Sequence, residues 1–337
     1  MEKSDRGIRA FVAGLAALSL GLLSNNAFAQ SFYQGFEFSG LFDYGQGVIH
    51  TSPSGSTVET DYATGINASS GGFDARLSVQ PSVDIEQTGN TGCAPGSSTC
   101  VGPFTLWGLA FNSVSPAAGI PMQNGGAVDG VDIYLDMTFA ANNSDYRFDW
   151  DSALADSEAS FLQDYIFNAG TGNPSQPVAC APMSGGYFVI AASNNSQRGS
   201  AYPQDPNKSP QCIAKSGWYT FQHYFHPDKQ KNLQVDMTIS DPKNHVVASW
   251  SMHPTCMGAQ VTENLCSNGA PLPFSAVGAN AYGWFPDQEI DNLAIDNVFL
   301  NPVCQSFFGG FGGLGCLNGF PHPGHGFGFP RFFHRGW

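Results

Sequence analysis

The stretch Leu233-Gln234-Val235-Asp236-Met237-Thr238-Ile239 carries an apolar residue at every odd position. Alternation with a period of two is typical of a strand that buries one face. The next residues, Ser240-Asp241-Pro242-Lys243-Asn244-His245, place a proline in a turn, and a second apolar run follows from Val246 to Trp250. This part of the chain therefore predicts an antiparallel β-hairpin.

Similar short runs of apolar and aromatic residues recur between turn-forming clusters. They predict further strands over 36–42, 73–79, 104–114, 131–139, 146–150, 161–167, 187–192, 219–225 and 293–300. Only residues 151–165 have the alanines, leucine and capping residue of a helix, and a strand from Phe161 onward competes for the second half of that segment. We predict an all-β fold, a large antiparallel β-sandwich of jelly-roll or concanavalin-like type, over residues 30–300.

The two ends of the chain differ from this body. Residues 1–29 are organised as a signal peptide, with basic residues first, an apolar run over 11–23 and the small-residue site Ala27-Phe28-Ala29. We therefore expect a secreted, periplasmic or cell-surface protein with no transmembrane segment in the mature chain. Residues 301–337 hold ten glycines and eight phenylalanines, a composition that predicts a low-complexity, largely disordered tail.

The net charge of the chain argues against several classes of binding partner. The chain has 13 Lys and Arg against 27 Asp and Glu, a net charge of −14. Nucleic acids and anionic lipids need clustered basic residues, so this balance argues against both. It also disfavours polyanionic glycans such as alginate or pectate, although calcium could bridge them to the acidic chain. The same balance leaves carboxylates available for calcium.

All eight cysteines follow the signal segment, and an even count in an exported chain indicates disulfides. Eight cysteines permit 105 pairings, which the sequence cannot distinguish. Sequential placement around loops favours four neighbouring pairs, and the absence of any Cys-x-x-Cys spacing disfavours the alternative of a zinc site. The favoured pairs are Cys93 with Cys100, Cys180 with Cys212, Cys256 with Cys266, and Cys304 with Cys316.

Catalytic motifs give little support for an enzyme. Glu289-Ile290-Asp291 begins the Glu-x-Asp pattern of laminarinase-like glycosidases, but Leu293 and Ala294 stand where the second Glu should be. No Gly-x-Ser-x-Gly elbow occurs. His223 and His226 have no carboxylate at metal-ligand spacing, so we expect core or surface histidines there.

The ends of the predicted body resemble jelly-roll carbohydrate-binding modules. Such modules often open on a Gly-Phe-Glu strand and close on an Asp-Asn-Val strand, and this chain has Gly35-Phe36-Glu37 and Ile295-Asp296-Asn297-Val298. The resemblance implies a structural calcium ion that joins the first and last strands, with Glu37 and Asp296 as ligands. An oxygen-rich site of this kind neutralises carboxylates near a sheet interior.

A longer resemblance, to exported bacterial proteins of unassigned activity, runs through the second half. Its motifs include Arg147-Phe148-Asp149-Trp150, Gly217-Trp218-Tyr219-Thr220-Phe221 and Tyr282-Gly283-Trp284-Phe285. Some of those proteins end in a PEP-CTERM sorting segment, whose Pro-Glu-Pro motif and apolar span are missing here.

These observations favour a secreted, non-catalytic, lectin-like protein that binds extracellular or cell-wall polysaccharide. Trp284 is the predicted stacking platform, with Tyr282 and Trp107 beside it and with Asp287 and Glu289 orienting sugar hydroxyls. Two alternatives stay open: a polysaccharide hydrolase or lyase with an unrecognised site, and a structural surface or matrix protein.

Overall fold

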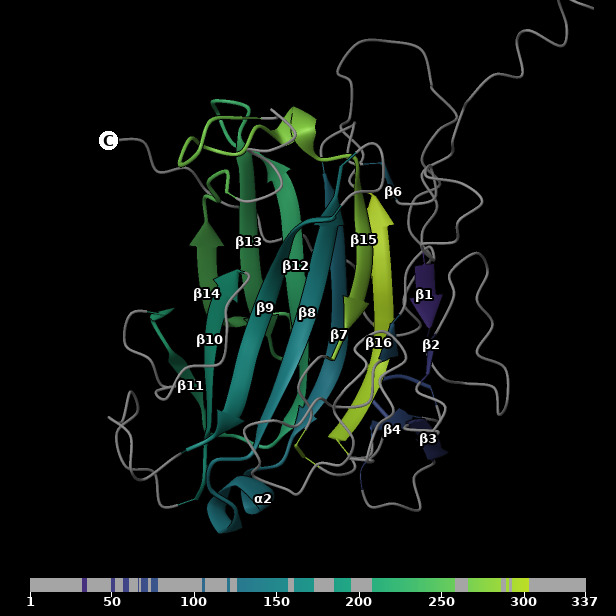
Figure 1. Ribbon diagram of the computed structural model, residues 1–337. Helices are drawn as coiled ribbons and strands as arrows, with labels where there is room; N and C mark the ends of the chain where they lie inside the picture. The colour runs from purple at the N-terminus through teal and green to yellow at the C-terminus, as the bar shows by residue number, and fades with distance from the viewer. Residues whose placement is uncertain are drawn as a thin grey trace, which may run out of the picture.

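The computed structural model describes residues 32–34, 50–51, 57–60, 66, 68–71, 74–77, 105–106, 120–121, 126–156, 161–172, 185–194, 208–257, 266–285, 289–290 and 293–302. Two antiparallel sheets stack face to face (Figure 1). The predicted all-β sandwich is thereby confirmed. Within the described residues, no helix is both long and apolar enough to cross a bilayer.

The larger sheet has eight strands in the order β14-β13-β12-β7-β16-β4-β3, and β1 pairs with β16. Their bounds are β1 Phe32–Gln34, β3 Thr57–Thr60, β4 Asp74–Leu77, β7 Ala127–Leu135, β12 Gly217–Pro227, β13 Leu233–Ser240, β14 Val246–Met252 and β16 Leu293–Pro302.

The smaller sheet has six strands in the order β11-β10-β9-β8-β15-β6. Their bounds are β6 Ile120–Pro121, β8 Arg147–Ala155, β9 Phe161–Thr171, β10 Phe188–Asn194, β11 Gln211–Ile213 and β15 Ala279–Trp284. A separate pair joins β2 (His50–Thr51) to β5 (Thr105–Leu106), and a 3-10 turn, η4, spans Phe274–Ala276.

The hairpin predicted from the alternating stretch is present as β13 and β14. Asp241 fixes the turn, because its Oδ1 accepts hydrogen bonds from the backbone N–H groups of Lys243 and His245 at 2.8 and 2.9 Å. Asn244 has a φ of 62°, a left-handed conformation that asparagine tolerates better than most residues. The local sequence thus specifies both strands and their connection.

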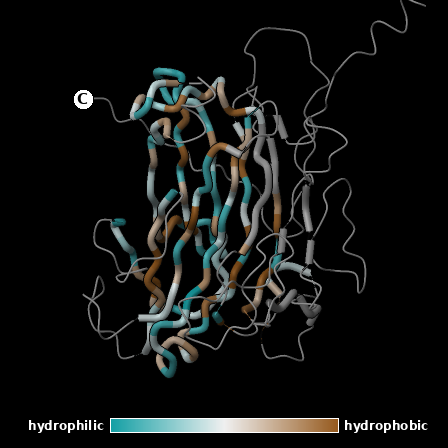
Figure 2. The backbone as a smooth tube through the Cα atoms, in the orientation of Figure 1, coloured by the Kyte–Doolittle hydropathy of each residue, from teal (hydrophilic) through white to brown (hydrophobic). Residues whose placement is uncertain are grey.

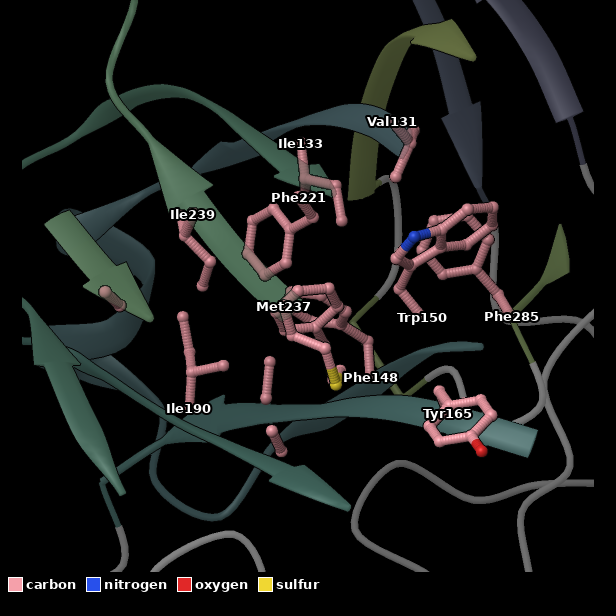
Figure 3. Close-up of a cluster of buried hydrophobic side chains, with 14 of the residues drawn as sticks. Val131, Ile133, Phe148, Trp150, Tyr165, Ile190, Phe221, Met237, Ile239 and Phe285 are labelled. Atoms are coloured by element: carbon pink, nitrogen blue, oxygen red, sulfur yellow. The ribbon is translucent and has the colours of Figure 1, made fainter. Parts of the chain in front are cut away.

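Aromatic side chains fill the space between the sheets (Figure 3). Phe221 on β12 lies 6.0 Å from the ring of Phe148 on β8 and 5.3 Å from that of Phe167 on β9. Trp150 packs against Phe285 at 5.1 Å. Burying each of these side chains contributes roughly 1.5–3 kcal/mol to stability. Hydrophilic and hydrophobic residues are mixed along the strands (Figure 2), as expected when one face of a strand is buried and the other is not.

The helix considered for residues 151–165 is wrong, and the competing strand from Phe161 onward is confirmed. Asp151–Ala155 completes β8, and Phe161–Thr171 forms β9. β8 pairs with β15 on one side and β9 on the other, and every residue from Phe148 to Ala155 is buried. Pairing on both sides and packing on both faces override the modest helix propensity of alanine and leucine.

The strand expected over 131–139 is also too long. It ends at Leu135, and α2 spans Met137–Asn142. Asp136 ends the strand, because its side chain accepts a hydrogen bond from the backbone N–H of Thr138 at 2.8 Å and so caps the helix.

Candidate functional site

Strand β8 places two carboxylates on the side of the six-stranded sheet that faces away from the core. Phe148, Trp150 and Leu154 belong to the core cluster. Because successive side chains on a strand point to opposite faces, Asp149 and Asp151 lie on the other face. They are nevertheless only 6% and 1% exposed.

Asn168 on β9 lies directly opposite Asp149 and organises the polar groups around it. Its Nδ2 donates to Asp149 Oδ1 at 3.1 Å. Its Oδ1 accepts from Ser193 Oγ on β10 at 2.6 Å and from Lys208 Nζ at 3.4 Å. Three neighbouring strands and one following segment therefore contribute to a single preorganised array.

Asp164 adds a third carboxylate to this face, because it stands four residues before Asn168 on the same strand and opposite Ala153. Burial raises the pKa of Asp164 to about 7. At neutral pH this carboxyl group is therefore divided between its protonated and ionised forms. We call the surface formed by Asp149, Asp151, Asp164, Asn168, Ser193 and Lys208 the outer six-stranded face.

Two residues of the predicted aromatic platform lie on the strand beside this face. In the β15–β8 register, Trp284 is opposite Asp151 and Tyr282 is opposite Ala153. On the other side of β8, Asp151 is opposite Ile166, which is opposite Ser193 on β10. Ala153 is opposite Asp164. The structure thus brings the backbone positions of Tyr282 and Trp284 into register with the carboxylates.

Of the remaining predicted ligand contacts, Glu289 lies within the described residues. Glu289 is 2% exposed, and its backbone N–H donates to the carbonyl of Arg147 at 2.7 Å. Glu289 is therefore buried, and its role in orienting sugar hydroxyls stays a prediction. Trp107 and Asp287 lie outside the described residues.

The sequence analysis assigned none of the residues of this face to ligand binding, namely Asp149, Asp151, Asp164, Asn168, Ser193 and Lys208. The spacing of Asp149 and Asp151 was the available signal, because residues two apart on a strand share a face. Nothing in the sequence marks Ser193 or Lys208 as their neighbours, because those contacts depend on which strands pair.

A second polar network lies inside the sandwich. Asp129 on β7 faces His223 on β12, and Asp129 Oδ1 lies 2.8 Å from His223 Nδ1. The hydroxyl group of Ser152, on the opposite sheet, donates a hydrogen bond to Asp129 Oδ2. His223 and Ser152 are completely buried. The expectation that His223 is a core histidine is confirmed, and a buried hydroxyl bonded to the carboxylate is not arranged as a nucleophile.

The predicted metal ligand Asp296 is fully buried on β16. Its Oδ2 accepts from the backbone N–H of Ser70 at 3.0 Å, and its Oδ1 accepts from that of Asn297 at 2.7 Å. Glu37 lies outside the described residues, among which no group of three or more His, Cys, Asp and Glu side chains could hold a metal ion. These two hydrogen bonds hold the Asp296 side chain in place, and the calcium site stays a prediction.

Other structural features accord with the sequence-based expectations. The first and last strands pair, with Gln34 opposite Val298. Cys256 and Cys266 form a disulfide, with a Cα–Cα separation of 6.1 Å. Cys212 is also disulfide-bonded. The other five cysteines, Cys93, Cys100, Cys180, Cys304 and Cys316, lie outside the described residues.

The fold and site define an antiparallel β-sandwich with a preorganised polar face. No protein-family model matches the chain, and no curated protein does either. Among solved structures, it is similar to a marine alginate lyase from Aplysia kurodai, with 7% identity over 82% of this chain and 100% of that one and a TM-score of 0.39. It is also similar to an alginate lyase solved with an alginate trisaccharide, with 8% identity over 77% and 98% of the two chains and a TM-score of 0.33. Likenesses this distant carry no inference about activity.

Proposed function

We propose that this protein is an exported, lectin-like sandwich that binds a polysaccharide on the outer six-stranded face without turning it over. The cross-strand array centred on Asn168 carries the proposal. Carboxylate, amide, hydroxyl and ammonium groups held at fixed positions are the partners that sugar hydroxyls require. Burying such groups away from a core costs free energy, so their concentration on one face is typical of a functional site.

The charges of this face favour a neutral or weakly basic glycan. Asp149, Asp151 and Asp164 lie together, and Lys208 supplies a positive charge near them. Arg147, two residues before Asp149 on β8, is paired with Asp145 at 2.6 Å. A uronate polymer would bring further carboxylates into a low-dielectric surface, where repulsion between like charges is strong. We therefore expect weaker binding to alginate or pectate than to an uncharged chain.

Stacking supplies the second element of the proposal. Tyr282 and Trp284 occupy β15, in register with the carboxylate rows. An aromatic ring stacked on one face of a sugar would orient that sugar against the polar side chains. Such stacking would contribute about 0.5–1.5 kcal/mol to the free energy of binding, beyond the burial of apolar area. For a binding protein we expect a shallow aromatic surface here rather than an enclosed catalytic pocket.

A glycan array on the chain from Gln30 onward tests the proposal, followed by affinity measurements on any ligand found. Trp284→Ala should weaken binding about tenfold or less with an unchanged melting temperature. A large drop in melting temperature would instead place Trp284 in the core and remove it from the site.

Lys208→Ala provides a second test. Its control is Lys243→Ala, which removes the same charge from the exposed hairpin turn. Lys208 donates to Asn168, and a hydrogen bond from a charged group contributes roughly 1.5–3 kcal/mol. We expect about a tenfold loss of affinity for Lys208→Ala and none for Lys243→Ala. Equal affinities of both variants and the wild type would contradict the assigned face.

Asp164 supports one alternative, a polysaccharide hydrolase. Its carboxyl group, with a pKa of about 7, could donate a proton while Asp151 acts as the base. The two residues are diagonal neighbours on β9 and β8, at a Cα separation of roughly 7–8 Å. Incubating the bound glycan with the protein distinguishes the functions, since new reducing ends would indicate hydrolysis and unsaturated ends a lyase.

A further inference from the structure

The opposite side of the molecule carries a second, more open polar surface, over the hairpin of the eight-stranded sheet. Burial alternates strictly along β13: Leu233, Val235, Met237 and Ile239 are completely buried, whereas each intervening residue is partly exposed. We define the outer hairpin face by six residues at alternate positions of β12 and β13, namely Gln222, Tyr224, His226, Gln234, Asp236 and Thr238.

One end of this face is held rigidly around Asp236. His226 Nε2 lies 2.8 Å from Asp236 Oδ2, and Ser251 Oγ and Gln234 Nε2 donate to Oδ1 at 2.6 and 2.9 Å. The rings of Tyr224 and His226 stack with centroids 4.2 Å apart. The His226 and Asp236 side chains are 17% and 19% exposed, so the ordered groups remain accessible to a ligand.

Hydroxyl and amide side chains continue across the strands beside this cluster. Gln222 on β12 is opposite Thr238 on β13, which is opposite Ser249 on β14. Neighbouring strands lie about 4.8 Å apart, and the eight residues of β13 span roughly 27 Å. The result is a long, ordered surface with hydrogen-bonding groups at regular intervals.

The charge of the outer hairpin face indicates which class of ligand it can bind. Its carboxylate, Asp236, is paired with His226 and accepts two further hydrogen bonds. The remaining defining residues are an aromatic ring, amides and a hydroxyl. This balance contrasts with the net charge of −14 for the whole chain. It is complementary to an uncharged, hydroxyl-rich polymer rather than to a polyanion or a polycation.

A second copy of the chain fits this surface less well. Stable interfaces between copies have an apolar centre. Among the described residues, the large apolar side chains that are well exposed lie at or beyond the ends of the edge strand β14: Val246 and Val247, at 44% and 42%, at its start, and Met257, at 43%, after its end. The middle of the face is polar.

We propose that the outer hairpin face is a second binding surface, which seats an uncharged polysaccharide chain across β12, β13 and β14. The two outer faces lie on opposite sides of the sandwich (Figure 1). If the function proposed above holds, one molecule therefore contacts two glycan chains and cross-links them. Simultaneous binding at two faces raises the overall avidity without any new contact.

Thr238→Lys tests this surface, because it places a charged side chain on β13, the middle strand of the three, without changing the core. Asn268→Lys, in an exposed loop, makes the same charge change as a control. We would measure two properties of both variants. The first is retention in gels that contain a soluble, uncharged β-glucan, which reports binding. The second is light scattering of the protein mixed with that glucan, which reports cross-linking. Trp284→Ala is measured in parallel as the variant for the other face.

We expect Thr238→Lys to reduce retention at least tenfold and to abolish the growth of light scattering that reports cross-linking, while Asn268→Lys behaves as the wild type. A Thr238→Lys protein that is retained and cross-links like the wild type would overturn the second surface. Loss of retention with Trp284→Ala and none with Thr238→Lys would likewise remove it and leave the first face standing. The reverse result would support the second surface and remove the first.

Discussion

Asp129 and His223 face each other across β7 and β12 with their side chains directed into the core, and 2.8 Å separates Asp129 Oδ1 from His223 Nδ1. Ser152 reaches the same carboxylate from the other sheet. The aromatic rings of Trp150, Phe167 and Phe225 surround His223. A polar contact between the two sheets is thus embedded in an apolar core, where each missing partner is costly.

The first prediction concerns this core network. Ser152→Ala should lower the free energy of unfolding by about 1–3 kcal/mol, because a buried acceptor loses one donor. Asp129→Ala should lower it by about 3–5 kcal/mol, because it removes the partner of both His223 and Ser152. Urea unfolding measures both. Ser249→Ala, on an exposed position of β14, should change stability by less than about 0.5 kcal/mol.

The second prediction concerns Asp164 and pH. Burial raises its folded-state pKa from 3.8 to about 7. Below pH 4 both states hold the proton. Between about pH 4 and 7 the unfolded state releases it first, so the free energy of unfolding falls through this window and the penalty persists above it.

Asp164→Asn removes this penalty, which is at most about 4 kcal/mol. The variant should be more stable than the wild type at pH 8, and the two should converge near pH 4. Urea unfolding across this range measures the effect. Asp145→Asn, at a more exposed carboxylate, is the control. Parallel stability curves for Asp164→Asn and the wild type would contradict the buried, protonated state.

The third prediction concerns the disulfides. Cys256 and Cys266 close a loop with a sequence separation of 10, and a cross-link over a short loop stabilises a protein by about 2–4 kcal/mol. Replacing both with alanine should lower the free energy of unfolding by about that amount. Peptide mapping without reduction should also find the pairs 93–100, 180–212 and 304–316. Free thiols or crossed pairs would contradict this connectivity.

The fourth prediction concerns calcium. β1 pairs with β16, and the described register ends at Gln34 opposite Val298, close to Glu37 and Asp296 in the sequence. We propose that a calcium ion joins the two strands there, so calcium should raise the melting temperature relative to a chelator. Glu37→Gln should remove the difference. Identical melts of the wild type, with no metal found by elemental analysis, would exclude the site.

Local sequence determined the hairpin, because alternation and a proline-containing turn act within a few residues. It also indicated most strands, and the sandwich follows from many strands that each have an apolar face. The same local rules failed at 151–155, where alanine and leucine suggested a helix, but they did indicate the strand from Phe161 onward. Pairing with β9 and β15, which no local pattern reports, decided that segment.

The sequence also indicated the aromatic residues of β15, because tryptophan and tyrosine among glycine and acidic residues are recognisable alone. Only the tertiary structure placed Asp149, Asn168, Ser193 and Lys208 together, since they come from three strands and a later segment. A strand's alternation fixes which side chains share a face, but hydrogen bonding between distant segments fixes which strands are neighbours. The core was therefore largely readable from the sequence, whereas the candidate site was decided by strand pairing.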